Sequence, residues 1–352
     1  MGKIKAFLTR KNVLPSARRY GVDATGAMAQ GLFASLLIGT IIKTLGQQAG
    51  VPFLVDAGNF AQQVAGPAMA VSIGAALAAP QLVLFSLIAV GMAANSLGGA
   101  GGPLAVYVIS IIACECGKMV SKETNVDILV TPAVTVLAGC GLAMLCAPAI
   151  GAAASAVGGF IKWATQLQPF LMGVLVSVAV GMALTLPISS AAICAALSLT
   201  GLAGGAAVAG CCAQMVGFAV MSFRENGVGG LVSQGLGTSM LQMPNILRNP
   251  RIWIPPTLAS AFTGPIATCL FHLEMNGPAV SSGMGTCGLV GQIGVYTGWL
   301  NDIAAGAKAA ILPMDWIGLA VVCFVAPAVL SLICCRALQK WGWIKQGDMR
   351  LP

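Results

Sequence analysis

The sequence predicts an all-α polytopic membrane protein with about ten transmembrane helices and two opposed re-entrant hairpins. Hydrophobic residues make up 57% of the 352-residue chain, charged residues make up 8%, and the mean hydropathy is +0.89. A soluble domain carries about 25% charged residues, so this composition indicates a chain that resides in a bilayer. With about 20 residues for each crossing, there is room for roughly ten spans and for little else.

The expected elements follow from the apolar segments and the glycine, proline and charged residues between them. Residues 1–22 are polar and basic, which predicts an amphipathic segment on the cytoplasmic surface. The run 187–223 contains 37 residues, about 55 Å of helix, so it must break, and glycine-rich residues 201–205 are the expected place. Residues 98–103 read GGAGGP and are expected to break the chain between two spans. A seam is expected near residues 158–168. The ten predicted spans are approximately 24–45, 59–79, 81–97, 104–120, 127–149, 169–186, 188–202, 206–223, 253–271 and 316–335.

The distribution of basic residues orients these spans. With both termini in the cytoplasm, all of the 18 Lys and Arg residues except Lys43, Lys162 and Lys308 fall in cytoplasmic segments, as the positive-inside rule requires. The sequence therefore predicts a multi-pass membrane protein with both termini in the cytoplasm. The net charge of +8 is a topology signal, since the basic residues cluster at the two ends and in two internal loops without an aromatic platform for nucleic-acid bases, and no nucleic-acid partner is expected.

Several function classes are excluded by missing motifs. The 12 cysteines lie mostly in apolar runs without the spacing of a zinc or iron–sulfur site, so we interpret them as structural and expect no metal or cofactor. No Walker A motif, zincin motif or nucleophile elbow is present, which argues against an ATP-driven pump and a hydrolase. No catalytic residue is identified.

A short glycine–threonine motif occurs twice, and the expected hairpins are built around it. Residues 235–239 read GLGTS and residues 283–287 read GMGTC, on either side of the predicted span 253–271. Non-helical backbone at membrane depth survives only where protein or a water-filled cavity satisfies its polar groups. Paired broken segments of this kind point to a transporter's substrate site, with re-entrant elements near 227–247 and 277–296. The alternative is that small residues merely allow close helix packing.

His272 and Glu274 are the leading candidates for the solute site, because ionisable residues near membrane depth are costly. An imidazole and a carboxylate can both hydrogen-bond the hydroxyl groups of a sugar or polyol. The alternative is that both side chains lie in interfacial water. Neutral partners for a hydroxylated solute are expected around them: Gly237, Thr238, Ser239, Gln242, Asn245, Ser282, Gly285, Thr286 and Gln292. Helix N-termini would instead suit an anionic solute. Gln214, inside a span, is interpreted as a contact between helices.

The runs GTSMLQMPNILRNPRIWIPPTLASAFTGPIAT (237–268), SSGMGTCGLVGQIG (281–294) and GVDATGAMAQGLFASLLIGTIIKTLG (21–46) resemble the enzyme IIC-like membrane proteins of the bacterial phosphotransferase system. The resemblance is to the branch described partly as sugar permeases and partly as perfringolysin-type regulators. It implies a homodimer with a scaffold and dimerisation domain at 23–165 and a transport domain at 166–352.

In sugar transporters of this kind a His and a Glu hold the sugar during an elevator movement, so the resemblance implies these roles for His272 and Glu274. The Gly-Ile-Thr-Glu signature of those transporters is absent, and residues 283–287 occupy its place without a carboxylate. Phosphorylation would require separate IIA and IIB phosphocarrier subunits. The alternatives are an ion-coupled secondary transporter of a small organic acid or polyol, and a membrane sensor or regulator without transport.

Overall fold

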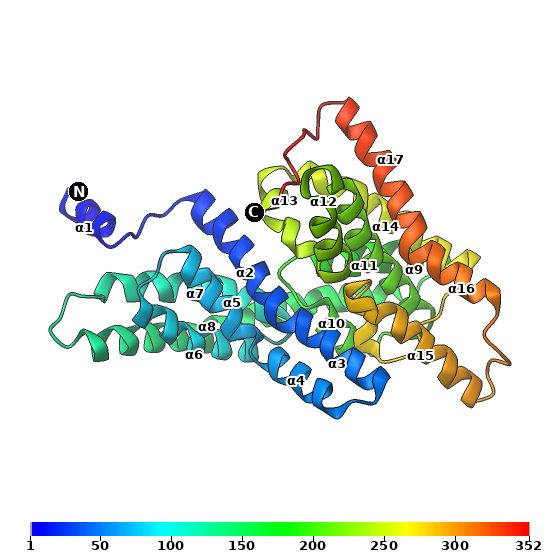
Figure 1. The fold of residues 1–352 in the computed structure, drawn as a ribbon, viewed down its shortest axis with the longest axis horizontal. Helices are drawn as coiled ribbons and strands as arrows, with labels where there is room; N and C mark the ends of the chain where they lie inside the picture. Colours follow the sequence, from blue (N-terminus) through cyan, green and yellow to red (C-terminus); the bar gives the residue numbers. More distant parts are fainter. Residues whose placement is uncertain (1, 352) are drawn as a thin grey trace. The chain divides into compact units, whose positions relative to one another are not determined.

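The computed structural model describes residues 2–351, and all its named elements are helices (Figure 1). An isolated β-bridge pairs Gly201 with Met275. The chain forms two compact units, Met1–Ala154 and Ser155–Pro352. This division falls inside helix α8, whereas the boundary expected at residues 165/166 lies just after that helix ends.

The first unit contains seven complete α-helices and the start of an eighth. Its elements are α1 (Gly2–Arg10), η1 (Arg18–Asp23), α2 (Ala24–Leu32), η2 (Phe33–Leu37), α3 (Ile38–Ala49), α4 (Pro52–Gln63), α5 (Ala65–Ala76), α6 (Gln81–Gly98), η3 (Gly99–Gly101), α7 (Gly102–Val120) and the first part of α8 (Asp127–Ala164). Helix α5 packs against α2, α6 and α7. The predicted glycine-rich break is confirmed, because α6 ends at Gly98 and α7 begins at Gly102.

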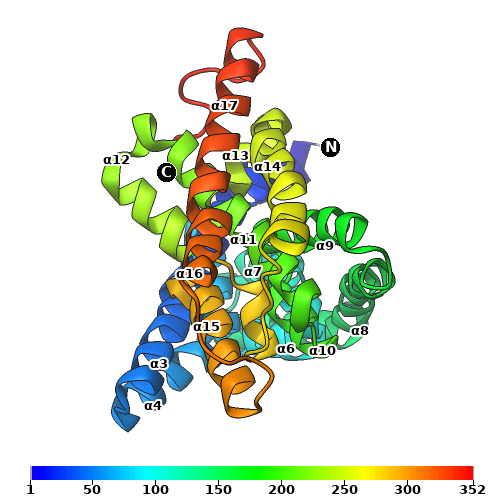
Figure 2. The same cartoon turned by 90° about the vertical axis from the view of Figure 1, so that its right-hand side faces the viewer.

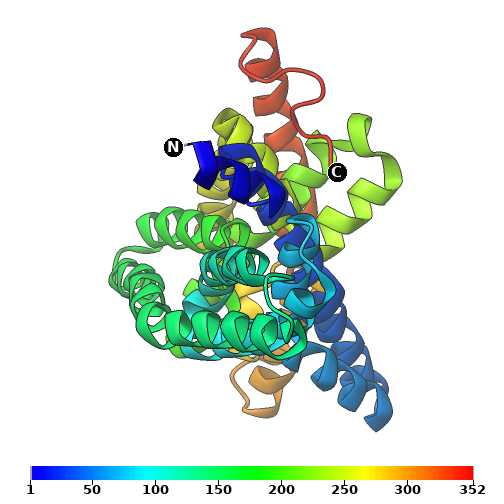
Figure 3. The same cartoon turned by 90° about the vertical axis from the view of Figure 1, so that its left-hand side faces the viewer.

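Two expected spans in this unit have different limits in the structure. The segment 59–79 is divided between α4 and α5, which meet at Val64. Helix α8 continues to Ala164 instead of ending near residue 149, although it contains Pro132 and Pro148 (Figure 3, teal to green). Residues 149–157 are mostly alanine, the best helix former, so the hydrogen bond lost at Pro148 does not end the helix.

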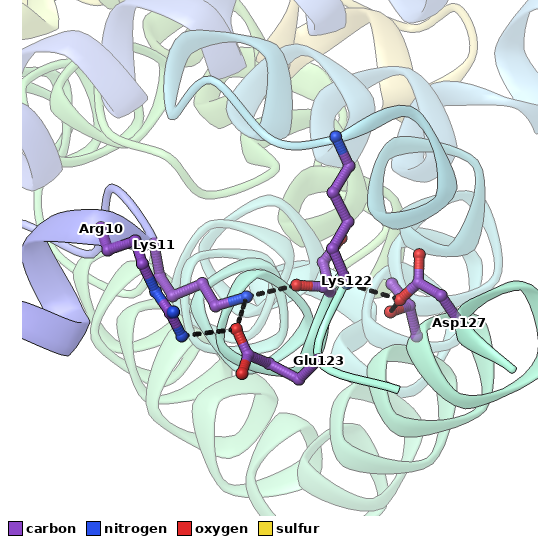
Figure 4. Close-up of polar contacts among 7 residues, drawn as sticks. Arg10, Lys11, Lys122, Glu123 and Asp127 are labelled. Atoms are coloured by element: carbon purple, nitrogen blue, oxygen red, sulfur yellow. Dashed lines mark hydrogen bonds and ion pairs between the residues drawn. The ribbon is translucent and has the colours of Figure 1, made fainter. Parts of the chain in front are cut away.

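The end of α1 is held against the loop that precedes α8 (Figure 4). Arg10 Nη2 lies 2.7 Å from Glu123 Oε1, and Lys11 Nζ contacts the same carboxylate and the carbonyl oxygen of Ser121. The hydrogen bond from Lys11, together with the charge of Arg10, lowers the pKa of Glu123 below its ordinary value. The basic segment at the chain's start is thus anchored by a carboxylate more than one hundred residues away.

The second unit contains the remaining helices and both glycine–threonine motifs. Its elements are the rest of α8, α9 (Pro169–Thr185), α10 (Ser190–Ala196), α11 (Gly201–Met221), α12 (Phe223–Val232), η4 (Ser233–Gly237), η5 (Ser239–Gln242), α13 (Met243–Arg248), η6 (Pro250–Trp253), α14 (Ile254–Pro265), η7 (Ile266–Leu270), η8 (Ala279–Gly283), η9 (Cys287–Leu289), α15 (Val290–Ala304), α16 (Pro313–Ala320), η10 (Val321–Val325) and α17 (Ala326–Lys340).

Helix α11 is the core of this unit. It is rich in Gly, Ala and Cys, and most of its residues are buried. Small side chains let neighbouring helices approach closely, and α11 packs against α9, α14 and α17 (Figure 2). The small side chains of α11 therefore allow other helices to pack against it on several sides.

The predicted span 188–202 is wrong. Helix α10 has only seven residues, about 10 Å of rise, which is too short to cross a bilayer. Its start is fixed by Ser189, whose Oγ accepts a hydrogen bond from the backbone N–H of Ala192 at 3.2 Å. The chain then turns, and α11 begins at Gly201, where the sequence predicted a break.

Within residues 2–351, five helical stretches are long and apolar enough to cross a membrane, judged by length and composition. They are Arg18–Ala49, Gln81–Val120, Asp127–Ala164, Gly201–Met221 and Pro313–Lys340. Two further apolar helices, Ala65–Ala76 and Pro169–Thr185, are shorter. The chain is a multi-pass helical membrane protein, but the ten crossings expected from the sequence are not confirmed, since α10 is too short to cross.

Candidate functional site

The first glycine–threonine motif interrupts a helical segment. Element η4 ends at the buried Gly237, and Thr238 has extended backbone angles (φ −160°, ψ 143°) before η5 begins. Thr238 Oγ1 accepts a hydrogen bond from the backbone N–H of Met240 at 3.1 Å, which caps η5. Ser239 Oγ lies 2.8 Å from Thr185 Oγ1 on α9. Both hydroxyl-bearing residues of this motif therefore have partners within the protein.

The second motif follows the short helix η8 and is pressed against α11. Gly285 has a φ of +55°, and a Cβ added there would lie 2.7 Å from the Cβ of Cys211. Only glycine meets both requirements without strain, because it tolerates the left-handed region and close backbone approach. Ser282 Oγ donates a hydrogen bond of 2.6 Å to the carbonyl oxygen of Leu199, which joins this element to the turn after α10.

The two motifs touch each other. Thr286 Oγ1 donates a hydrogen bond of 2.5 Å to the carbonyl oxygen of Gly235. Thr286 is fully buried, and the flanking Gly237 and Gly285 are buried as well. Two elements separated by about fifty residues of sequence are thus in direct contact in the interior of the second unit.

Gln292 lies on the first turn of α15, and only one end of its side-chain amide forms a hydrogen bond within the described residues. Its Nε2 donates a hydrogen bond to Cys212 Sγ at 3.2 Å. Its Oε1 is buried and has no hydrogen-bond partner among the described residues. Buried amide oxygens are almost always paired, so this free acceptor marks a place where a ligand hydroxyl or a water would be accommodated.

Gln242 and Asn245 bind the end of the chain. Gln242 Nε2 donates to the carbonyl oxygen of Met349, and Asn245 Nδ2 donates to that of Arg350, both at 2.9 Å. The backbone N–H groups of Gly347 and Met349 donate to the two carboxylate oxygens of Glu225, each at 3.0 Å. The C-terminus consequently lies beside α12 and α13 (Figures 1 and 2).

Gln214 connects three helices, as the sequence predicted. Its Oε1 accepts hydrogen bonds from Trp253 Nε1 at 2.9 Å and from Thr185 Oγ1 at 3.2 Å, while its Nε2 donates to Thr257 Oγ1 at 3.3 Å. Since Thr185 also contacts Ser239, this network reaches the first glycine–threonine motif. The contact between helices is therefore also a support for that motif.

His272 and Glu274 lie in the non-helical segment that follows η7. His272 has a φ of +45°, and Met275 pairs with Gly201 in an isolated β-bridge. Burial alternates from residue to residue along this segment. Leu273 and Met275 are buried, whereas His272 and Glu274 are exposed. The alternation presents the two candidate side chains to the same side.

Both side chains line a pocket of about 310 Å³. Asn276 links two of the carboxylates of the pocket. The Nδ2 atom of Asn276 donates hydrogen bonds to Glu274 Oε2 at 3.1 Å and to Asp302 Oδ2 at 2.9 Å. Lys308 also lines the pocket, and its Nζ lies 2.8 Å from Asp315 Oδ2. Trp299 adds an aromatic face beneath Lys308, with Nζ 5.6 Å from the ring centroid. The pocket combines carboxylates, an amide, an imidazole, an ammonium group and an indole.

The structure thus separates the predicted residues into groups. His272 and Glu274 share the pocket, Gly237, Thr238, Ser239, Gly285 and Thr286 lie at the contact between the motifs, and Gln242 and Asn245 hold the C-terminus. None of the described residues that line the pocket belongs to either motif. Among residues 2–351, no group of three His, Cys, Asp or Glu side chains is arranged to hold a metal ion.

Sequence reasoning missed Asn276, Trp299, Asp302 and Lys308. A signal for two of them was available, since Asp302 is one of only ten acidic residues and Lys308 is one of three basic residues outside the predicted cytoplasmic segments. Their position close to the predicted second hairpin made them candidates of the same kind as Glu274. Asn276 and Trp299 carried no comparable signal.

Comparison with known proteins gives one result. The family model described as Phosphotransferase system, EIIC matches residues 22–351. No curated protein and no solved structure gives a significant match. The match includes both units, both glycine–threonine motifs and every residue of the pocket. The chain therefore belongs to the phosphotransferase system EIIC family.

Proposed function

We propose that this EIIC protein moves a small hydroxylated solute, a sugar or polyol, across a bacterial inner membrane and holds it in the pocket of His272 and Glu274. The observation that carries the proposal is the pocket itself, which brings both ionisable candidates together with Asn276, Asp302 and Trp299. Its volume of about 310 Å³ lies at the lower end of the range for small-molecule sites.

The chemistry of the pocket suits hydroxyl groups. The carboxylates of Glu274 and Asp302 accept hydrogen bonds, and the ammonium group of Lys308 and the imidazole of His272 supply donors. Three carboxylates, those of Glu274, Asp302 and Asp315, and the one ammonium group of Lys308 line the pocket, so the excess of negative charge favours an uncharged solute over an anion. The indole of Trp299 offers an apolar surface for the C–H face of a sugar ring.

We further propose that the contact between the two motifs is a closed gate in the solute's path. The hydrogen bond from Thr286 to Gly235 joins two segments of short, broken helix, so it can be lost without unfolding a long helix. Gln292 Oε1, buried and unpaired among the described residues, supports a second polar contact for the solute along this path.

The remaining expectations of the resemblance belong to the same proposal. The second unit, residues 155–352, holds the pocket and the gate, which supports its role as the domain that carries the solute in an elevator movement. The first unit would then be the scaffold and the surface for a homodimer. Separate IIA and IIB phosphocarrier subunits would phosphorylate the solute on the cytoplasmic side.

The test is uptake by cells that express the wild-type chain, Glu274→Gln, His272→Ala or the control Asp56→Asn. Asp56 is an exposed carboxylate of the first unit, so its substitution removes the same charge away from the pocket. We expect Glu274→Gln and His272→Ala to abolish uptake while membrane insertion stays normal. Normal uptake by both variants would overturn the site.

The same cells separate the proposal from its alternatives. Uptake by an EIIC component requires the phosphocarrier subunits. Uptake that persists without those subunits and collapses with an ionophore would instead identify an ion-coupled transporter. Saturable binding without flux in liposomes would identify a sensor.

A further inference from the structure

A second cavity, of about 670 Å³, lies in the same unit away from the His272 pocket. It is lined by the end of α11, the start of α12, the last turns of α17 and the segment that follows α17. Three basic side chains surround it: Arg224, Arg336 and Lys345. The proposed transport path uses none of these residues.

The three basic side chains have no charge partner in the described chain. All three are exposed, and no ion pair joins any of them to a carboxylate within residues 2–351. The one acidic residue of the cavity wall is Glu225, and both its carboxylate oxygens already accept hydrogen bonds from the backbone N–H groups of Gly347 and Met349. The cavity therefore presents an excess of positive charge.

Aliphatic side chains also line the cavity. Val220, Leu332 and the buried Ile344 are among them. A site for a small soluble anion needs charges and hydrogen-bond donors, but gains nothing from aliphatic walls. A cavity lined by both cations and aliphatic side chains fits a molecule that carries a phosphate and a hydrocarbon chain.

The cavity lies where two membrane spans end. The candidate spans Gly201–Met221 and Pro313–Lys340 terminate at residues that flank it. Trp341 and Trp343 follow directly, with exposed fractions of 68% and 43%, and exposed tryptophans are enriched at the interface between lipid and water. The position of the cavity at the ends of these spans therefore suits a lipid headgroup, with aliphatic side chains of the spans within reach of its acyl chain.

We propose that this cavity binds an anionic phospholipid, with its phosphate between Arg224, Arg336 and Lys345 and an acyl chain along Val220 and Leu332. Basic pockets between transmembrane helices bind anionic headgroups in this way. Lys345 and Ile344 belong to the segment after α17, so a bound lipid also contacts the C-terminal segment that Glu225 holds.

The experiment is a titration of the purified full-length chain, in a neutral detergent, with dioleoylphosphatidylglycerol, dioleoylphosphatidylcholine or inorganic phosphate at constant ionic strength. The thermal unfolding midpoint reports binding, because a ligand that binds only the folded state raises it. We expect phosphatidylglycerol alone to raise the midpoint. Native mass spectrometry should show the same lipid retained on the chain.

The variants test the cavity. Each basic residue close to an anionic lipid strengthens binding about fivefold, so Arg224→Gln/Arg336→Gln should weaken the apparent affinity for phosphatidylglycerol about thirtyfold. Arg248→Gln is the matched control, since Arg248 is an exposed arginine of the same unit that does not line the cavity. Should the double variant not fold, Lys345→Gln, at an exposed position, is expected to weaken binding about fivefold.

Three results would overturn the proposal. One is an equal response to phosphatidylcholine, and another is wild-type affinity for phosphatidylglycerol in the double variant. The third is a response to inorganic phosphate as large as that to the lipid and lost in the double variant, which would assign the cavity to a soluble phosphate or a phosphorylated protein.

Discussion

The hydroxyl group of Thr286 donates a hydrogen bond of 2.5 Å to the carbonyl oxygen of Gly235, and this bond joins the two glycine–threonine motifs. Thr286 is fully buried, whereas Gly235 is half-buried. Loss of the bond would leave the hydroxyl group of Thr286 and the carbonyl oxygen of Gly235 without each other as partners, unless the two motifs separate and let water or solute in. The bond therefore links the stability of the second unit to the state of the proposed gate.

The first prediction concerns this bond. Thr286→Val keeps the side-chain shape but removes the donor, which should lower the free energy of unfolding by about 1–3 kcal/mol. We also expect faster labelling of the neighbouring Cys287, which is 1% exposed, by a maleimide, measured by peptide mass spectrometry. Thr297→Val is the control, because Thr297 Oγ1 bonds only to Ile293 within its own helix. Equal labelling of Cys287 in all three proteins would contradict the gate.

The second prediction concerns the segment that carries His272 and Glu274. A Cβ added at Gly205 would lie 1.7 Å from the carbonyl oxygen of Leu273. Gly205→Ala must therefore displace the segment that carries His272 and Glu274, and it should destabilise the protein by about 1–3 kcal/mol. Gly229 is exposed on α12 with no atom within 4 Å of an added Cβ. Gly229→Ala should instead stabilise by about 0.5–1 kcal/mol. Thermal unfolding of the two variants should therefore shift in opposite directions, and a shift of the same sign in both would refute the packing at Gly205.

The third prediction concerns the C-terminal segment. Glu225→Gln weakens two hydrogen bonds to the backbone of Gly347 and Met349, and hydrogen bonds to a charged group contribute about 1.5–3 kcal/mol. Trypsin should consequently cleave after Lys345 at least about tenfold faster than in the wild type. Asp56→Asn should leave this rate unchanged. If the cleavage rate of Glu225→Gln matches that of the wild type, the carboxylate does not hold the segment.

The fourth prediction is a pH dependence at the other end of the chain. Lys11 and Arg10 lower the pKa of Glu123. The stabilisation that this carboxylate gives to the attachment of α1 is therefore complete above the ordinary glutamate pKa, and it is lost as pH falls through the lowered pKa. A nitroxide at Ala6→Cys, with exposed Cys146 and Cys269 replaced by serine, should gain mobility only in that acidic range. With Glu123→Gln added, the label should be mobile at every pH. A label equally immobile with and without that substitution would show that Glu123 does not anchor α1.

The sequence was sufficient to predict a helical membrane protein and the positions of two breaks between helices. Apolar composition predicted a helical membrane protein, and the glycine pattern predicted breaks at residues 98–103 and near Gly201, which the structure confirms. It did not predict that α10 would be too short to cross or that α8 would continue past Pro148. Both depend on local hydrogen bonding, at Ser189 and in the alanine-rich segment, that hydropathy does not record.

The candidate site was predicted only in part, because its partners come from distant segments. Alternation around His272 and Glu274 could be read in the sequence, but the contribution of Asp302 and Lys308 depends on how α15 and the segment after it return to the pocket. Gln242 and Asn245 show a second limit of the sequence. Their amides suit a solute, and in the structure they donate to backbone carbonyls of the C-terminal segment, a contact that no local pattern indicates.

The most direct test of the central proposal is a thermal-shift screen of the purified chain against sugars, polyols and small organic acids. The proposal predicts that a sugar or polyol raises the unfolding midpoint of the wild type and of Asp56→Asn but not that of Glu274→Gln. A sugar or polyol that stabilises Glu274→Gln as much as the wild type would contradict the site, and stabilisation by organic acids alone would contradict the class of solute.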